Sequence, residues 1–194
     1  MNTAEPIREQ QVLENFKKYY ICKEPNIRNY TLLCFGLNTA LRISDILRLK
    51  WWDVYDFELD KFRGHIQLSE QKTGKDSRIY MNKNVVDALE RYKRLLQRED
   101  EILYKQYIFE GYNGKQLSRV QAWRIIRKAA EECNLSGVIS PHSLRKTFGY
   151  QAWQQGIQPV MLMEIYNHSS FAITKRYLGI QQDDRDEVFR NICL

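Results

Sequence analysis

The sequence predicts an α+β fold that is mainly helical and contains one small antiparallel sheet. Apolar residues recur at the three- and four-residue spacing of an amphipathic helix near the N-terminus and again from Val85 onwards. Between these regions, short stretches rich in β-forming residues alternate in polarity. The segment Lys72-Thr73-Gly74-Lys75-Asp76 separates the last two stretches and predicts a hairpin turn.

Helices are expected before the sheet. The first covers Glu9–Cys22 and ends before Pro25, because the residue preceding a proline avoids helical geometry. The second, Ile27–Thr39, is mostly apolar and is expected to be buried. The third, Ser44–Leu49, has Ser44 placed to cap its N-terminus.

The predicted strands are Trp52–Phe57, His65–Glu70 and Ser77–Met81, which make a sheet of two or three strands. Helical periodicity returns at Val85–Gln97, and Ile108-Phe109 is expected to be extended. Further helices are expected at Ser118–Asn134, Pro141–Gln155, Pro159–Tyr166, Ser170–Leu178 and Asp183–Ile192. In the helix Ser118–Asn134, the inward residues are predicted to be Val120, Trp123, Ile126 and Ala130, opposite a basic face of Arg119, Arg124, Arg127 and Lys128.

The composition is that of a folded protein with an excess of positive charge. The chain has 194 residues, a net charge of +6 and a pI of about 9.1, which favours polyanionic partners such as nucleic acid. Its cysteines, Cys22, Cys34, Cys133 and Cys193, form no C-x-x-C pair, so neither a zinc site nor a disulfide framework is expected. Without an apolar run of about 18 residues or a signal peptide, we expect no membrane association and a cytoplasmic protein.

The segment from Ser140 to Arg145 predicts an anion site at the start of a helix. Ser140 is suited to the N-cap and Pro141 to the first helical position. His142 and Arg145 then share one face of the first turn, where free backbone N–H groups favour anions. A phosphate there would meet an imidazole and a guanidinium together. The simpler interpretation is a surface His and Arg near a helix start.

A second set of residues surrounds Tyr177. Asn167 or Ser169 is suited to cap the helix that carries Tyr177, with His168 near its start. A phenol has a pKa near 10, so it needs positive charge and a base to act as a nucleophile at neutral pH. A half-buried tyrosine that only packs beside Leu178 is the commoner alternative.

Two further cations stand out. Arg42 lies between apolar helical segments and is expected to be partly buried, so it needs a partner. Asp45 is one candidate partner, and a bound phosphate is the other. Lys72 lies at the hairpin tip, where it is either a solvated turn residue or an ammonium that reaches into a groove.

Together these elements resemble the tyrosine recombinase family, also called phage integrases. The order of the matching residues is Arg42, Lys72, His142-x-x-Arg145, His168 and Tyr177. Residues 37–54 resemble the first arginine box of the family, residues 72–75 its hairpin lysine, and residues 141–148 and 167–177 its second box. The resemblance covers about residues 31–188 and implies the catalytic core fold of that family.

The family mechanism implies a role for each matching residue. Arg42 and Arg145 would bind the non-bridging oxygens of the scissile phosphate and stabilise its pentacoordinate transition state. Tyr177 would attack and form a 3′-phosphotyrosyl link, while Lys72 would protonate the departing 5′ oxygen.

The histidines complete the implied site, with His142 assisting proton transfer and His168 hydrogen-bonding the phosphate. Neither a metal nor another cofactor is expected, because two guanidinium groups supply the positive charge that Mg²⁺ supplies elsewhere. Candidates for contacts with the DNA are Lys75, Arg78, Arg119, Arg124, Arg127 and Lys128.

The resemblance also implies an assembly. The partner would be double-stranded DNA, bound by a homo-tetramer on synapsed duplexes, and a monomer is left open for the chain without DNA. We expect residues 1–194 to form one catalytic domain without the N-terminal core-binding domain of many integrases, and the last helix, about 183–192, to dock onto a neighbouring protomer. Tyr166-Asn167 stand where the family often has Leu-Gly, a change expected to alter packing more than chemistry.

Three alternatives compete with a site-specific recombinase. A type IB topoisomerase shares the chemistry but relaxes supercoils without a partner site. A catalytically silent DNA-binding regulator would bind without a covalent adduct. A helical interaction module with no nucleic-acid role leaves Arg42, Arg145 and the positive charge unexplained.

Overall fold

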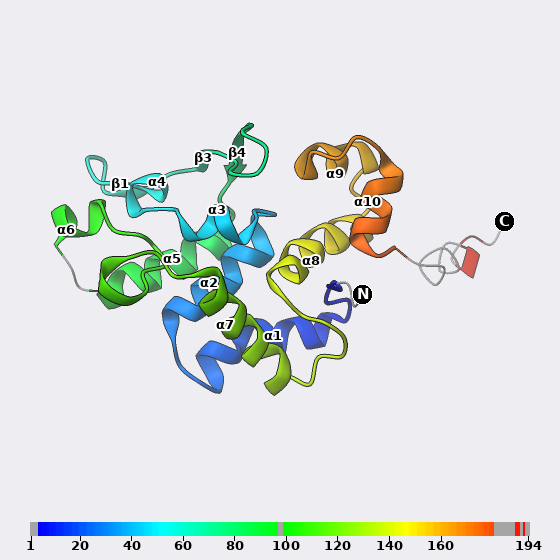
Figure 1. Cartoon of the computed structure of the whole chain (residues 1–194), viewed down its shortest axis with the longest axis horizontal. Helices are drawn as coiled ribbons and strands as arrows, with labels where there is room; N and C mark the ends of the chain where they lie inside the picture. The colour runs from blue at the N-terminus through cyan, green and yellow to red at the C-terminus, as the bar shows by residue number, and fades with distance from the viewer. Residues whose placement is uncertain (1–3, 97–98, 181–188, 191, 193–194) are drawn as a thin grey trace.

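The structure is a computed structural model that describes residues 4–96, 99–180, 189, 190 and 192. The central helix is α2 (Ile27–Asn38), which packs against α1 (Gln10–Cys22), α5 (Lys83–Leu96) and α8 (Pro141–Gln154) (Figure 1). From this helical body α8 leads to a smaller group formed by α9 (Pro159–Tyr166) and α10 (Phe171–Leu178). The helices expected from the sequence in these regions are therefore confirmed, with ends shifted by one or two residues.

The β structure forms two hairpins instead of one sheet. Strand β1 (Tyr55–Asp56) pairs with β2 (Lys61–Phe62), and β3 (His65–Ser69) pairs antiparallel with β4 (Asp76–Tyr80). The predicted turn between β3 and β4 is confirmed, and Gly74 has the positive φ of +66° for which glycine is suited.

The predicted strand Trp52–Phe57 is wrong in its first half, because Trp51–Val54 is the short helix α4. The Asp53 carboxylate accepts a hydrogen bond from the Lys50 backbone N–H at 2.8 Å, which caps this turn of helix. Helix α6 (Asp100–Tyr104) and the 3₁₀ turn η1 (Tyr112–Gly114) were not expected.

The core divides into three apolar clusters. The largest joins α2, α4, β3 and α5, and its centre contains Phe35, Trp51 and Phe109. A second lies among α1, α2, α7 (Arg119–Glu132) and α8. The third is small and joins Ala40, Leu162, Tyr166 and Leu178 between α8, α9 and α10. This third cluster supports the candidate active site described below.

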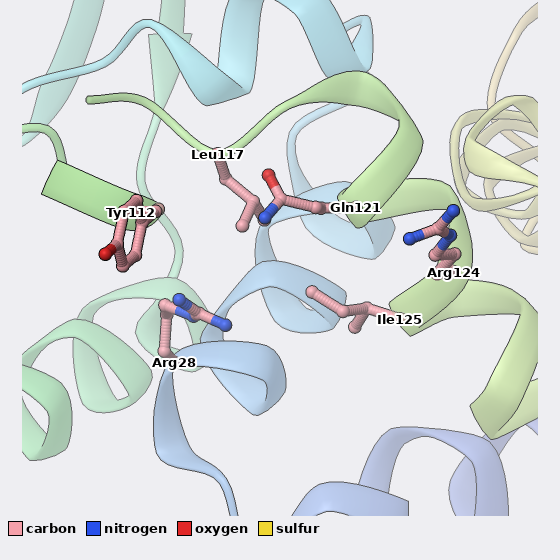
Figure 2. Close-up of a pocket in the computed structure, with 7 residues that line it drawn as sticks. Arg28, Tyr112, Leu117, Gln121, Arg124 and Ile125 are labelled. Carbon is pink, nitrogen blue, oxygen red and sulfur yellow. The ribbon is translucent and has the colours of Figure 1, made fainter.

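Helix α7 is oriented differently from the prediction. Ile126 and Ala130 are buried as expected, but Val120 and Trp123 are 58% and 46% exposed. The buried face is completed by Ala122 and Ala129, whose small side chains let α7 approach its neighbours closely. Beside α7 lies a hollow of about 450 Å³, lined by Arg28, Gly111, Tyr112, Leu117, Gln121, Arg124 and Ile125 (Figure 2).

The β3–β4 hairpin faces α9 (Figure 1). A groove between them is lined by residues of both elements. The groove has a volume of about 600 Å³, and Arg78, Tyr80 and Ile165 are among its lining residues. Most of the helix predicted at 183–192 lies outside the described residues. Within the part that is described, no helix is long and apolar enough to cross a membrane.

Candidate active site

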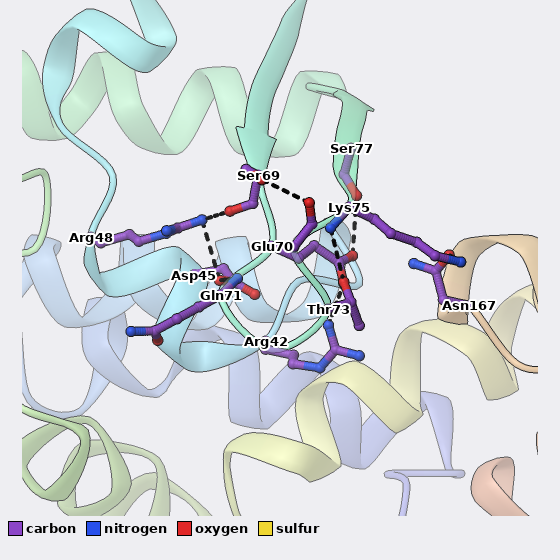
Figure 3. Close-up of polar contacts among 11 residues, drawn as sticks. Arg42, Asp45, Arg48, Ser69, Glu70, Gln71, Thr73, Lys75, Ser77 and Asn167 are labelled. Atoms are coloured by element: carbon purple, nitrogen blue, oxygen red, sulfur yellow. Dashed lines mark hydrogen bonds and ion pairs between the residues drawn. The ribbon is translucent and has the colours of Figure 1, made fainter.

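Arg42 is the N-cap residue of α3 (Ile43–Leu47), where the backbone enters the helix after Ala40 with a positive φ of +53°. Ser44, the residue predicted for this cap, lies inside the first turn, so that prediction is wrong. The Arg42 guanidinium forms an ion pair with the Glu70 carboxylate at the end of β3 (Figure 3). This ion pair joins the start of α3 to the end of β3.

Asp45, one of the two candidate partners of Arg42, has other contacts. Its Oδ1 accepts a hydrogen bond from the Gln71 backbone N–H at 2.9 Å and lies 3.5 Å from Arg48 Nη2 (Figure 3). Of the two candidate partners of Arg42, Asp45 is therefore ruled out, and Glu70 is the carboxylate that pairs with Arg42. Asp45 is fully buried and ties α3 to the hairpin backbone instead.

Glu70 is a site residue that the sequence did not reveal. Besides Arg42, its carboxylate accepts hydrogen bonds from Thr73 Oγ1 at 2.9 Å and Ser77 Oγ at 3.1 Å (Figure 3). Burial alone would raise the pKa of Glu70, but these donors and the Arg42 charge outweigh it and lower the pKa below its usual value. Glu70 is therefore an ionised, 4% exposed counterion that orients Arg42.

Arg145 and His142 lie on the first turns of α8, as the sequence predicts. Ser140 is the N-cap, its backbone N–H donates to Ser143 Oγ at 3.1 Å, and Pro141 occupies the first helical position. Arg145 is buried and His142 is exposed. The Arg145 guanidinium carbon lies 4.9 Å from the centroid of the Tyr166 ring.

The electrostatic environment shows that the predicted cations are close together. The pKa of His142 is lowered by partial desolvation and then by Arg145, Lys146, Lys72 and Arg42, in that order. Desolvation, Arg145 and Arg42 likewise lower the pKa of His168. Both histidines are thus neutral at pH 7 and able to accept a proton.

Tyr177 lies on α10 against the same cluster. Its ring centroid is 5.1 Å from that of His168 and 5.2 Å from that of Tyr166. Burial raises the pKa of Tyr177, and a hydrogen bond and positive charge from Arg145, with a smaller contribution from Arg42, act in the opposite direction. The phenol is thus half-buried beside both guanidinium groups.

The turn between α9 and α10 differs in detail from the prediction. Neither Asn167 nor Ser169 caps α10, because Ser170 is the N-cap and its Oγ accepts from the Ile173 backbone N–H at 3.4 Å. Asn167 ends α9 with a φ of +55°, a left-handed conformation that asparagine tolerates better than most residues. His168 Nδ1 lies 3.0 Å from Thr174 Oγ1, which fixes the ring beside Tyr177.

Lys72, Lys75 and Arg78 are all exposed on the β3–β4 hairpin. The positive charge of Lys72 is one of the charges that lower the pKa of His142 at the start of α8. Lys75 Nζ donates to Asn167 Oδ1 at 3.4 Å and so connects the hairpin to the α9–α10 turn (Figure 3). The hairpin therefore carries three cations along one side of the candidate site.

The basic residues of α7 are not part of this cluster. Arg124 lines the hollow in Figure 2, and Arg119 is exposed. Arg127 and Lys128 form ion pairs with Glu131 at 2.6 Å and Glu24 at 2.5 Å. Among the described residues there is no group of three or more His, Cys, Asp or Glu side chains that could hold a metal ion.

A family model described as "Phage integrase family" matches residues 5–183. The chain belongs to this family. It is 39% identical over 183 residues to "Probable integrase/recombinase YoeC" of Bacillus subtilis (strain 168), with 94% of this chain and 93% of that protein covered. It is also 30% identical to "Tyrosine recombinase XerD" of Mycobacterium leprae (strain TN), covering 78% of this chain and 48% of XerD.

The fold agrees with this assignment. A crystal structure of XerA recombinase superposes with a TM-score of 0.76 at 20% identity and covers 99% of this chain and 68% of that one. The predicted fold class, a tyrosine-recombinase catalytic core, is thereby confirmed. As a member of the phage integrase family, the chain is a tyrosine-type site-specific recombinase, an enzyme that breaks and rejoins DNA.

Proposed function

We propose that this phage integrase family member cleaves DNA by attack of the Tyr177 hydroxyl on a backbone phosphate. The new bond joins Tyr177 Oη to phosphorus, the bond from phosphorus to the 5′ oxygen breaks, and the products are a 3′-phosphotyrosyl link and a free 5′ hydroxyl. Rejoining is the reverse reaction with a different 5′ hydroxyl. The observation that carries this proposal is that Tyr177 packs on the same Tyr166 ring as Arg145, where the charges of Arg145 and Arg42 oppose the rise in its pKa.

The two guanidinium groups supply the electrostatic part of the mechanism. Charge accumulates on the non-bridging oxygens as the phosphate becomes pentacoordinate, and preorganised cations aimed at these oxygens lower the barrier. Arg145 is buried in α8, and Arg42 is held by Glu70, so both are oriented before DNA binds. Guanidinium groups suit this role because their planar donors match two oxygens of one phosphate.

The proton transfers follow from the ionisation states. Because burial raises the pKa of Tyr177, its proton must pass to a base as the oxygen attacks. His142 is neutral at pH 7 and assists this transfer, while His168, in ring contact with Tyr177, hydrogen-bonds the phosphate. Lys72 donates a proton to the departing 5′ oxygen from the hairpin.

The DNA partner and the assembly belong to the same proposal. The net charge of +6 and the exposed hairpin cations suit a DNA duplex, with Lys75 and Arg78 as backbone contacts. Further candidates for the same role lie on α7, away from the site: the exposed Arg119 and Arg124, and the ion-paired Arg127 and Lys128. Recombination of two duplexes would involve a tetramer of this chain.

A nicked duplex that traps the covalent intermediate tests the proposal. The protein would be incubated in EDTA with nicked duplexes that carry candidate sites from the DNA flanking its own gene, followed by a denaturing gel. Wild type and Tyr112→Phe, whose residue is 82% exposed in η1, are expected to give a shifted covalent band, and Tyr177→Phe none. A band that survives Tyr177→Phe would overturn the proposal.

A further inference from the structure

Tyr166, the last residue of α9, lies in contact with three of the proposed catalytic side chains. Its ring centroid is 4.9 Å from the Arg145 guanidinium carbon. The His168 ring stacks on it at 5.5 Å with an interplanar angle of 24°, and the Tyr177 ring lies at 5.2 Å with an angle of 51°. One buried aromatic ring therefore touches a cation, a histidine and the nucleophile.

The surrounding structure fixes this ring. Tyr166 is 1% exposed, and its hydroxyl donates to the Arg145 backbone carbonyl at 2.7 Å. Gly149 on α8 makes room for it, because a Cβ at that position would lie 2.4 Å from Tyr166 Oη. The ring is thus anchored to α8, the helix that carries Arg145.

We infer that Tyr166 is a positioning residue whose ring holds Arg145, His168 and Tyr177 in their reactive arrangement. This inference rests on the proposed function. The negative face of a tyrosine ring attracts a guanidinium group without using any of its N–H donors. Arg42 is oriented by an ion pair with Glu70, which occupies a donor, whereas a ring contact leaves the Arg145 donors available for Tyr177 and a phosphate.

The same ring connects side chains from separate elements. His168 and Tyr177 come from the turn after α9 and from α10, while Arg145 comes from α8. Removing the ring would leave a cavity among these side chains, and they would no longer be held against a common surface. Misplacement of a catalytic group by about 1 Å can lower a rate about a hundredfold. Tyr166 therefore ties the nucleophile to its stabilising cation.

The test measures single-turnover formation of the covalent adduct at saturating DNA, together with the Kd for DNA. Tyr166→Leu removes the ring. The rate constant is expected to fall about thirtyfold, because a desolvated cation–π contact is lost. The Kd for DNA is expected to change less than about threefold. Tyr166→Phe keeps the ring and loses only the hydroxyl, so a fall of about threefold is expected.

Tyr150→Leu is the matched control. Tyr150 is also a buried tyrosine of this region, 6% exposed, with the Arg8 guanidinium carbon 4.7 Å from its ring centroid. This variant is expected to lower Tm about as much as Tyr166→Leu while its rate constant stays near that of wild type. If Tyr150→Leu and Tyr166→Leu slow the reaction equally, general loosening explains the effect and the inference fails.

A second series separates ring electrostatics from packing. Phenylalanines with increasing numbers of fluorine atoms at position 166 keep the shape of the ring and weaken its negative face. The rate constant is expected to fall with each added fluorine, and equal rates across the series would overturn the inference. The adduct assay also distinguishes the two proposals. If the wild-type protein forms no adduct, the proposed function itself is refuted. If wild type forms the adduct and Tyr166→Leu forms it equally fast, only the role of Tyr166 is refuted.

Discussion

The substitution Glu70→Gln tests how Arg42 is held. It keeps the shape of the side chain but removes the charge that pairs with Arg42. Thr73 and Ser77 donate to different oxygens of the carboxylate, so the single oxygen of the amide keeps only one of these two hydrogen bonds. The two side chains are 18% and 4% exposed, so water replaces little of the lost interaction. A hydrogen bond to a charged group contributes about 1.5–3 kcal/mol, and we expect the free energy of unfolding to fall by about 2 kcal/mol.

Thermal unfolding followed by circular dichroism measures this effect. For a chain of this size, about 2 kcal/mol corresponds to a decrease in Tm of roughly 4–8 °C. Glu90→Gln is the matched control, because Glu90 pairs with Arg94 at 3.0 Å on the surface of α5 with side chains 56% and 76% exposed. An exposed pair of this kind contributes at most about 0.5 kcal/mol. Equal Tm changes in the two variants would refute the assignment of Glu70 as a buried counterion.

The difference in stability between wild type and Glu70→Gln is expected to depend on pH. The pKa of Glu70 is lowered in the folded protein, so its charge stabilises the fold fully above the unfolded value of about 4.5. That contribution is lost as the pH falls through the lower folded pKa. The stability difference between wild type and Glu70→Gln should therefore be complete at pH 7 and shrink below about pH 4.5. A difference that does not change with pH would contradict the ionised state of Glu70.

Four further outcomes are expected. Arg145→Lys should lower the rate of adduct formation by about a hundredfold, because an ammonium cannot reproduce a planar fork of donors, and a rate near wild type would contradict the clamp. A duplex with sulfur in place of the 5′ bridging oxygen should restore most of the activity of Lys72→Met, since a thiolate leaves without a proton, and failure of this rescue would argue against Lys72 as the acid. The acid limb of kcat/KM should lie below pH 6.5, because the two site histidines have lowered pKa values and lose their neutral form only at lower pH; a limb above pH 6.5 would contradict this. Gly149→Ala should lower the free energy of unfolding by about 1–3 kcal/mol through contact with Tyr166, whereas Gly64→Ala, with nothing within 4 Å of its added Cβ, should change it little in thermal melts.

Local chemistry in the sequence predicted the elements that position the site. Ser140-Pro141 fixed the start of α8 and hence the shared face of His142 and Arg145. Gly74 predicted the hairpin turn because its positive φ is a local requirement. These features depend on neighbours within a few residues, so an alternating or capping pattern is sufficient to find them.

The predictions that failed depend on contacts between distant segments. Glu70 is 28 positions from Arg42, and only the folded chain shows that they pair. Trp51–Val54 contains good β formers, yet the Asp53 cap and burial of Trp51 in the core favour a turn of helix. The available signal for Glu70 was its place as the last residue of an alternating strand, two positions before the hairpin turn.

Helix α7 shows a different limit. Ile126 and Ala130 face the core as predicted, but Val120 and Trp123 do not, because Ala122 and Ala129 complete the buried face. Hydrophobicity alone ranks tryptophan above alanine for burial, whereas close packing of α7 against its neighbours needs the smaller side chain. The ring contacts of Tyr166 were not predicted for a similar reason, since they join side chains from α8, from the turn after α9 and from α10.

The most direct test of the account is to identify the residue that carries the DNA. The trapped adduct would be digested with protease and nuclease, and the nucleotide-linked peptide would be sequenced by mass spectrometry. The account predicts a phosphodiester on the oxygen of Tyr177, joined to the 3′ end of the cleaved strand. A nucleotide on any other residue, or a link to the 5′ end, would contradict it.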